Sequence, residues 1–235
     1  MADILLIHGS CHGAWCWRDV VPALAALGHS ARAIDLPGHG ADRTPAREVT
    51  LAGYAQAILD AIDDPVTLVG HSMGGFPITL AAQMAPEKVA RLVYLCAYVP
   101  VAGMSLADMR RAGPSQPLLE AIEMAPDRAT FTFRPEMVGA KLYHDCPPGT
   151  VDYAQARLCP QPVAPQATPI ATLDRWAGVE KHAILCEEDR AIPPAYQATM
   201  AAGFPPGHVT RMATSHSPFF ADPAGLAQRL NEIIP

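Results

Sequence analysis

Apolar runs alternate with segments of helical periodicity over residues 1–100 and again over residues 178–235. The runs predict buried strands, because they are short, aliphatic and rich in β-branched residues. They span residues 4–7, 30–34, 66–69, 89–97, 182–186 and 208–213. Strands that alternate with helices indicate a parallel sheet covered on both faces, so the expected fold is α/β with about six mostly parallel strands.

Helices are predicted between these strands, where apolar residues recur at i, i+3, i+4 and i+7. They span residues 15–27, 51–62, 76–85, 194–202 and 223–234. Three helix ends carry residues typical of a boundary. Thr50 and Asp222 precede first turns as N-caps, and Gly28 follows a last turn, where a left-handed backbone is favoured.

Residues 101–177 interrupt this alternation. Prolines, methionines and short amphipathic pieces replace it, with helical turns predicted at residues 106–111 and 117–124 and a strand at residues 130–133. We interpret the segment as a cap inserted at the carboxyl edge of the sheet, with residues 1–100 and 178–235 as the core. The alternative is a second, independently folding domain, which the scarcity of periodic apolar segments disfavours.

The strand at residues 66–69 leads directly into Gly70-His71-Ser72-Met73-Gly74, and a predicted helix follows. Strand, Gly-x-Ser-x-Gly and helix in this order are typical of a nucleophile elbow, a turn too tight for a Cβ at either glycine. Such a turn lifts the Ser72 hydroxyl clear of the sheet at a helix N-terminus, where negative charge is stabilised. The pattern also occurs by chance in flexible turns, so the rest of the chain must supply a base, an acid and an oxyanion hole.

The position of each histidine relative to the strand ends selects a candidate base, because ligands bind outside the carboxyl ends of the strands in an open parallel sheet. His216 follows the last predicted strand and is the best candidate. His71 lies inside the elbow, and its side chain is expected to turn away from Ser72. His8 and His12 belong to the first loop, where a structural role is expected.

The acid should follow another strand and precede His216 in the sequence. Asp189 is favoured because it lies at the turn into a predicted helix, and Glu188 is the reserve candidate. A carboxylate on Nδ1 of His216 would hold the tautomer whose Nε2 can accept the proton of the serine hydroxyl.

The oxyanion hole requires two backbone N–H groups aimed at one point. One is that of Met73, directly after the candidate nucleophile. The other is expected from the loop after the first strand, at Ser10. Gly9 and Gly13 allow this loop to bend tightly.

Charge, hydrophobicity and cysteine content limit the classes of partner and the cellular compartment that we expect. The formal net charge is −6 with no basic cluster, which argues against nucleic acid or an anionic membrane as a partner. The N-terminus shows no secretory signal, and no run is long and apolar enough to span a bilayer. The six cysteines lack zinc-site spacing, so we expect no metal and mostly buried, reduced thiols in a cytoplasmic protein, with a disulfide as the alternative.

Motifs in three loops and around the candidate acid and base occur together in a known family. The loop motifs are His8-Gly9-Ser10-Cys11-His12-Gly13-Ala14-Trp15-Cys16-Trp17, Asp35-Leu36-Pro37-Gly38-His39-Gly40 and Gly70-His71-Ser72-Met73-Gly74-Gly75. With the contexts of Asp189 and His216, they make the chain resemble the α/β-hydrolases. Within that family it resembles the subgroup of plant methylesterases, hydroxynitrile lyases and their bacterial esterase relatives. The resemblance covers nearly the whole chain and is weaker in the cap.

The resemblance implies a triad of Ser72, His216 and Asp189, with oxyanion donors at Ser10 and Met73. It also implies that no cofactor is needed and that a mostly apolar pocket lies under the cap.

Three residues are expected to line the pocket: Gly9, His12 and Tyr98. Gly9 in particular is expected to leave open space beside the oxyanion hole, for the alkoxy group of an ester or for the attacking water. The expected partner is a small-molecule ester, and the sequence is also compatible with a homodimer.

The leading hypothesis is a serine carboxylesterase that hydrolyses small esters through an acyl-enzyme. One alternative is a hydroxynitrile lyase, and another is a non-catalytic protein that binds a small ligand on the same fold. The lyases of the subgroup carry a lysine directly after the catalytic histidine, where this chain has Ser217. Of the three lysines, Lys88, Lys141 and Lys181, only Lys141 lies in a segment expected to approach the pocket.

Overall fold

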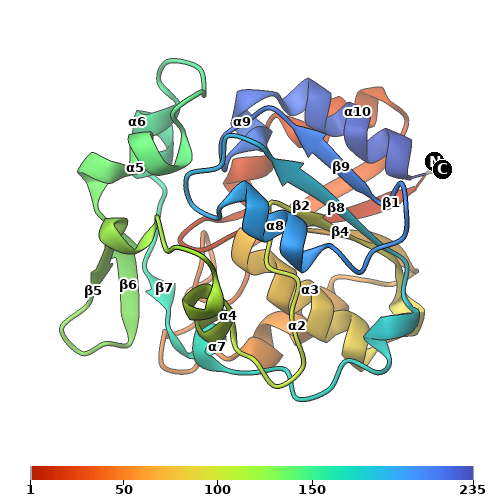
Figure 1. The fold of residues 1–235 in the computed structure, drawn as a ribbon, viewed down its shortest axis with the longest axis horizontal. Coiled ribbons are helices and arrows are strands. Elements are labelled where there is room, and N and C mark those ends of the chain that lie inside the picture. The colour runs from red at the N-terminus through yellow and green to blue at the C-terminus, as the bar shows by residue number, and fades with distance from the viewer. Residues whose placement is uncertain (1, 235) are drawn as a thin grey trace.

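The computed structural model describes residues 2–234, and its core is a six-stranded sheet (Figure 1). The strand order is β2-β1-β3-β4-β8-β9, and every neighbouring pair is parallel. The strands are β1 (Asp3–Ile7), β2 (Ser30–Ile34), β3 (Val66–His71), β4 (Val89–Leu95), β8 (Lys181–Cys186) and β9 (Val209–Met212). The predicted α/β fold with six strands is confirmed.

Alternate side chains of the central strands enter two separate apolar layers. Ile4 and Leu6 of β1 pack on one face of the sheet, whereas Leu5 and Ile7 pack on the other. Helices cover both faces, as Figure 1 shows, which is why the central strands carry mostly apolar residues on both faces of the sheet. The first face carries α1 (Val20–Ala26), α9 (Pro218–Ala221) and α10 (Pro223–Ile233), and the second carries α2 (Leu51–Asp60), α3 (Gly75–Met84) and α8 (Pro194–Met200).

The predicted helix boundaries are confirmed at three positions. The Thr50 hydroxyl accepts a hydrogen bond from the N–H of Gly53 at 2.9 Å, and the Asp222 carboxylate accepts one from the N–H of Gly225 at 2.8 Å. Gly28 has φ +88°, the left-handed backbone that ends α1.

The helix predicted over residues 15–27 is wrong as one element. The chain instead forms a 3₁₀ turn, Ala14–Trp17, followed by α1. Pro22 explains the break, because in a continuous helix its ring would clash with the carbonyl of Arg18 and one hydrogen bond would be lost. The helical turn predicted over residues 117–124 is also too long, since only Leu119–Ala121 is helical and β5 (Ile122–Met124) pairs with β6 (Thr130–Phe133).

Residues 101–177 lie beside the carboxyl ends of the core strands (Figure 1). They form a small antiparallel sheet, in the order β5-β6-β7, with four short helices. These elements are α4 (Leu106–Ala112), β6 (Thr130–Phe133), α5 (Pro135–Leu142), α6 (Thr150–Gln155), β7 (Gln161–Pro162) and α7 (Ala164–Ala167). The strand predicted at residues 130–133 is confirmed, and its two phenylalanines pack in the same apolar layer as β1 and α10.

All six cysteines are free thiols in the structure, four of them buried. Between residues 2 and 234, no helix is long and apolar enough to cross a membrane.

The join between β3 and α3 requires a glycine at residue 75. A Cβ there would overlap the carbonyl oxygen of Tyr98, which is backbone and cannot rotate away. We expect Gly75→Ala to lower the free energy of unfolding by about 2–3 kcal/mol, measured by urea denaturation. Gly203→Ala is the control, because its Cβ would meet nothing within 4 Å, and it should change stability by less than about 0.5 kcal/mol. Equal stability of the two variants would contradict this reading.

Candidate active site

Ser72 stands at the carboxyl end of β3 in a left-handed backbone conformation, with φ +55°. A non-glycine residue adopts that conformation only where its surroundings enforce it. The backbone around Ser72 is packed too tightly for a side chain at either flanking glycine. A Cβ on Gly70 would lie 2.6 Å from the carbonyl oxygen of Gly74, and a Cβ on Gly74 would lie 2.9 Å from the carbonyl oxygen of His8. The chain turns within the 3₁₀ segment Ser72–Gly74 and enters α3 directly. This is the geometry of a nucleophile elbow.

The structure brings Ser72, His216 and Asp189 together from three different strand ends. Nε2 of His216 lies 3.0 Å from the Oγ of Ser72, and Nδ1 of His216 lies 2.6 Å from an Oδ of Asp189. All three residues are buried, and Ser72 is the most exposed at 8%. With Nδ1 donating to the carboxylate, Nε2 is left to accept the proton of the serine hydroxyl.

Three further donors fix the carboxylate of Asp189. The N–H groups of Ala191 and Ile192 donate to one oxygen at 2.6 and 2.9 Å, and Nε2 of Gln197 donates to the other at 2.8 Å. Gln197 is itself held, since its side-chain oxygen accepts from the N–H of Cys186 at 3.0 Å. Gln197 was not among the residues predicted from the sequence. The feature that could have identified it is its place as a polar residue on the buried side of the helix next to the candidate acid.

Glu188, the reserve candidate for the acid, points elsewhere. Its side chain is exposed, and its backbone carbonyl accepts from the ring of His144 at 2.9 Å. The geometry therefore selects Asp189 over Glu188.

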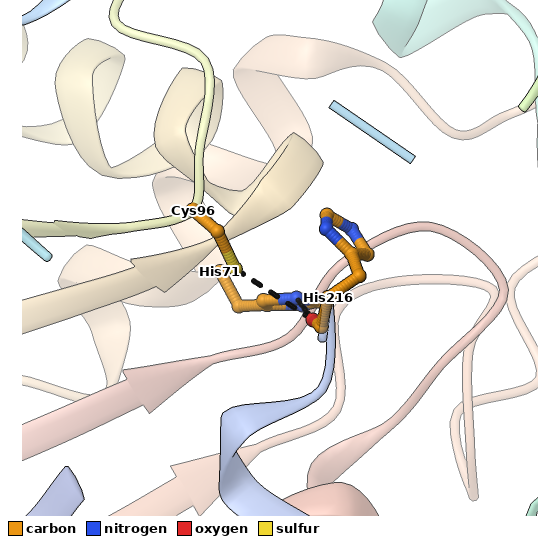
Figure 2. A group of neighbouring side chains, drawn as sticks. All are labelled: His71, Cys96 and His216. Carbon is orange, nitrogen blue, oxygen red and sulfur yellow. Dashed lines mark hydrogen bonds between the residues drawn. The ribbon is translucent and has the colours of Figure 1, made fainter. Parts of the chain in front are cut away.

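The backbone of His216 is held by two donors from neighbouring strands (Figure 2). Nε2 of His71 donates to the carbonyl oxygen of His216 at 2.8 Å, and the thiol of Cys96 donates to the same oxygen at 3.6 Å. Figure 2 shows the His216 ring turned away from both donors. Nitrogen and sulfur atoms of the three residues lie close enough to suit a metal ion, but His71 and Cys96 donate to a backbone carbonyl oxygen, and the ring nitrogens of His216 face Ser72 and Asp189.

His71 is neutral in this environment. Burial, followed by the neighbouring His216, lowers the pKa of His71 well below its ordinary value. The single ring proton is then the one on Nε2 that the carbonyl accepts, and Nδ1 has no hydrogen-bond partner. As expected, the His71 side chain does not line the cavity around Ser72, but its support of His216 was not foreseen.

The two expected oxyanion donors, Ser10 and Met73, both line the cavity that contains Ser72. Met73 directly follows the serine at the start of the turn into α3. Ser10 lies in the loop after β1, and its hydroxyl accepts from Nε2 of Gln166 at 2.8 Å, which ties this loop to α7. Gln166 is a further cavity residue that the sequence did not reveal.

Of the three residues expected to line the pocket, only Tyr98 does so. Gly9 does not, because the side on which its Cβ would lie is filled: that atom would be 2.7 Å from Nδ1 of His71 and 3.0 Å from the Cβ of Ser72. The open space expected beside Gly9 is therefore absent, and this expectation is wrong.

His12 is also not a lining residue, because both of its ring nitrogens are engaged, one within the first loop and the other with Tyr143 after α5. Nδ1 lies 2.7 Å from the carbonyl oxygen of Ser10, and Nε2 lies 2.6 Å from the hydroxyl of Tyr143. Burial lowers the pKa of His12 to about 4, so the ring is neutral at pH 7. Its role is structural, which agrees with the reasoning from its place in the loop and corrects its assignment to the pocket.

The cavity beside Ser72 is narrow, with a volume of about 30 Å³, and most of the residues that line it are apolar. Residues 101–177 provide much of its wall, through α4, the following loop and β6. The apolar members of this wall are Leu106, Leu118, Ile122, Phe131 and Phe133. Arg110 lines the same cavity and is a cation that was not among the residues expected there. The sequence feature that could have identified Arg110 is its spacing, because four residues after Leu106 it lies on the same face of a predicted helix.

Lys141, the one lysine in a segment expected to approach the pocket, does not line it. Its ammonium pairs with the carboxylate of Glu120. Arg110 therefore remains the cavity's cation among residues 2–234.

Comparison with known proteins agrees with this geometry. The model of the alpha/beta hydrolase family matches residues 4–229. Methylesterase 7 of Arabidopsis thaliana is 34% identical, over 97% of this chain and 95% of that protein. Methyl jasmonate esterase 1 of Vitis vinifera is 28% identical, over 98% and 95%. The solved structure of a pyrethroid hydrolase from Sphingobium faniae JZ-2 has a TM-score of 0.87 and 28% identity, over 99% and 96% of the two chains.

A match along nearly the whole chain, together with the elbow at Ser72, places the protein in its family. The chain belongs to the α/β-hydrolase family, in the subgroup that includes the plant methylesterases.

Proposed function

We propose that Ser72 is the nucleophile, His216 the general base and Asp189 the orienting acid of this enzyme, which is a serine hydrolase of carboxylic esters. The observation that carries the proposal is the 3.0 Å separation between the Ser72 hydroxyl and Nε2 of His216, at a turn that holds Ser72 at φ +55°. A hydroxyl within hydrogen-bond reach of a base that is itself oriented by a carboxylate is the arrangement that activates a serine.

The reaction follows from these positions. The Ser72 oxygen attacks the ester carbonyl while Nε2 of His216 takes its proton, and the developing oxyanion accepts hydrogen bonds from the N–H groups of Ser10 and Met73. His216 then protonates the leaving alcohol as the acyl-enzyme forms. Water, activated by the same nitrogen, hydrolyses the acyl-enzyme and restores Ser72.

We also propose that residues 101–177 act as a cap over residues 1–100 and 178–235. Two observations support this: the segment supplies much of the apolar wall beside Ser72, and its buried side chains share the apolar layers of the core sheet. The narrow cavity favours small esters. The names of the methylesterase relatives add methyl esters as the first substrates to try, and the free thiols agree with a cytoplasmic enzyme.

Ser72→Ala should remain folded and lose ester turnover by about 10⁴-fold or more, because triad members act as a unit. The measurement is kcat/KM on an aryl acetate, with thermal melting as the check on folding. Covalent labelling by a fluorophosphonate should disappear in the same variant. A folded variant that keeps turnover within tenfold of the wild type would remove Ser72 from the mechanism.

Asp189→Asn should lower kcat by about 10³–10⁴-fold, since an amide favours the wrong tautomer of His216. Glu188→Gln is the matched control, one residue away, with the same loss of charge on an exposed side chain. It should reduce kcat by less than about tenfold. The assignment of the acid fails if the two variants rank in the opposite order.

Cyanohydrin cleavage should not accompany ester hydrolysis. A departing cyanide benefits from a cation fixed beside the catalytic histidine. Ser217 occupies the next position in this chain, Lys141 is paired with Glu120 outside the cavity, and Arg110 lines the cavity from α4 and not from the loop of His216. The test compares cyanide release from mandelonitrile with hydrolysis of a methyl or aryl ester by the same preparation. Cyanide release at a rate comparable to ester turnover would overturn the prediction.

A further inference from the structure

Arg110 has no partner for its charge. Its guanidinium forms no ion pair with a carboxylate anywhere in residues 2–234, although the next residue on the helix, Arg111, pairs with Asp108. The Nε atom of Arg110 is enclosed and donates no hydrogen bond. An enclosed donor on a charged group without an acceptor costs free energy, and such a group is normally satisfied by a ligand or solvent.

The unpaired guanidinium lies at the wall of the cavity that contains Ser72. Arg110 and Tyr98 line the same cavity, and the charge of Arg110 opposes the effect of burial, which raises the pKa of the Tyr98 hydroxyl. The neighbouring wall is apolar, formed by Leu106, Ile122 and Phe131. In such a setting an anion meets a strong attraction that water would otherwise weaken.

A second, wider cavity of about 190 Å³ shares part of this wall. Arg110, Ile122, Phe131 and Gln166 line both cavities, so the guanidinium stands between the space at Ser72 and the space beyond. A substrate with its ester carbonyl at Ser72 can therefore extend along the same cavity to Arg110.

We propose that Arg110 is an anion-binding residue of the acyl side of this active site, and that the preferred substrates are half-esters of dicarboxylic acids. A carboxylate matches the planar fork of a guanidinium with two parallel hydrogen bonds. The proposal rests on the ester hydrolysis proposed above. Binding of the free carboxylate positions the ester at Ser72 and satisfies the charge of Arg110.

The test compares monomethyl esters with dimethyl esters of the same dicarboxylic acids, from succinate to suberate. For at least one chain length, the wild type should show a kcat/KM for the half-ester at least tenfold above that for the diester. Arg110→Gln should lower this ratio by about 10- to 100-fold, the range expected for a charge-assisted pair. Arg110→Lys should retain only part of the preference, because an ammonium keeps the charge but not the fork.

Arg111→Gln is the matched control: it removes the same charge from the same helix, on an exposed side chain outside the cavity, and should leave the ratio unchanged. A wild type that prefers the neutral diester at every length, or a ratio that Arg110→Gln does not alter, would overturn the proposal.

Hydrolysis of the dimethyl esters by the wild type tests the ester hydrolase function by itself. If the wild type hydrolyses no dimethyl ester, the proposed function fails independently of the role of Arg110. In that case calorimetry decides the role of Arg110, with monomethyl half-esters titrated into Ser72→Ala and into Ser72→Ala/Arg110→Gln. Binding that is weakened at least tenfold by the second substitution supports an anion site, and equal binding refutes it.

Discussion

The strained turn at Ser72 is the constraint on which the rest of the site depends. Holding a serine at φ +55° costs on the order of 1–3 kcal/mol, and the surrounding backbone must enforce it. Enforcement comes from contacts too close for any side chain at Gly70, Gly74 and Gly75, and from the N–H of Tyr98, which donates to the carbonyl of Ser72 at 3.2 Å. The turn therefore ties β3, α3 and the segment after β4 together.

Comparable strain recurs at the neighbouring strand ends. Cys11, after β1, and Cys96, after β4, also have positive φ, at +61° and +35°. Both residues hold neighbouring segments: the N–H of Cys11 donates to Gln161 of β7 at 3.2 Å, and the thiol of Cys96 donates to the carbonyl of His216. Residues with an unfavourable backbone conformation thus lie at the strand ends where the loops converge, as is typical of functional sites held by a rigid sheet.

His216 is fixed at both ends. Its backbone carbonyl is held by His71 and Cys96, and its ring lies between Ser72 and Asp189. A neutral His71 suits this role, because burial lowers its pKa and leaves one N–H for the carbonyl. A charged imidazole directly beneath His216 would oppose the positive charge that the base acquires when it takes a proton. The support of the base is therefore also electrostatic.

The sequence by itself determined the order of strands and helices along the chain and the elbow, and it selected Ser72, Asp189 and His216 as candidates, whose side chains the structure brings within hydrogen-bond distance. These follow from local rules, since a strand, a tight glycine turn and a helix cap each depend on a few neighbouring residues, and parallel strands bring their carboxyl ends to one edge. Only the tertiary structure decided which side chains surround the triad. Gly9 and His12 are turned from the cavity by contacts with His71 and Tyr143. Gln197 holds the carboxylate of Asp189 from α8, and Arg110 lines the cavity from α4. Such contacts depend on how whole elements pack, because helical spacing gives the face on which a residue lies but not what that face meets.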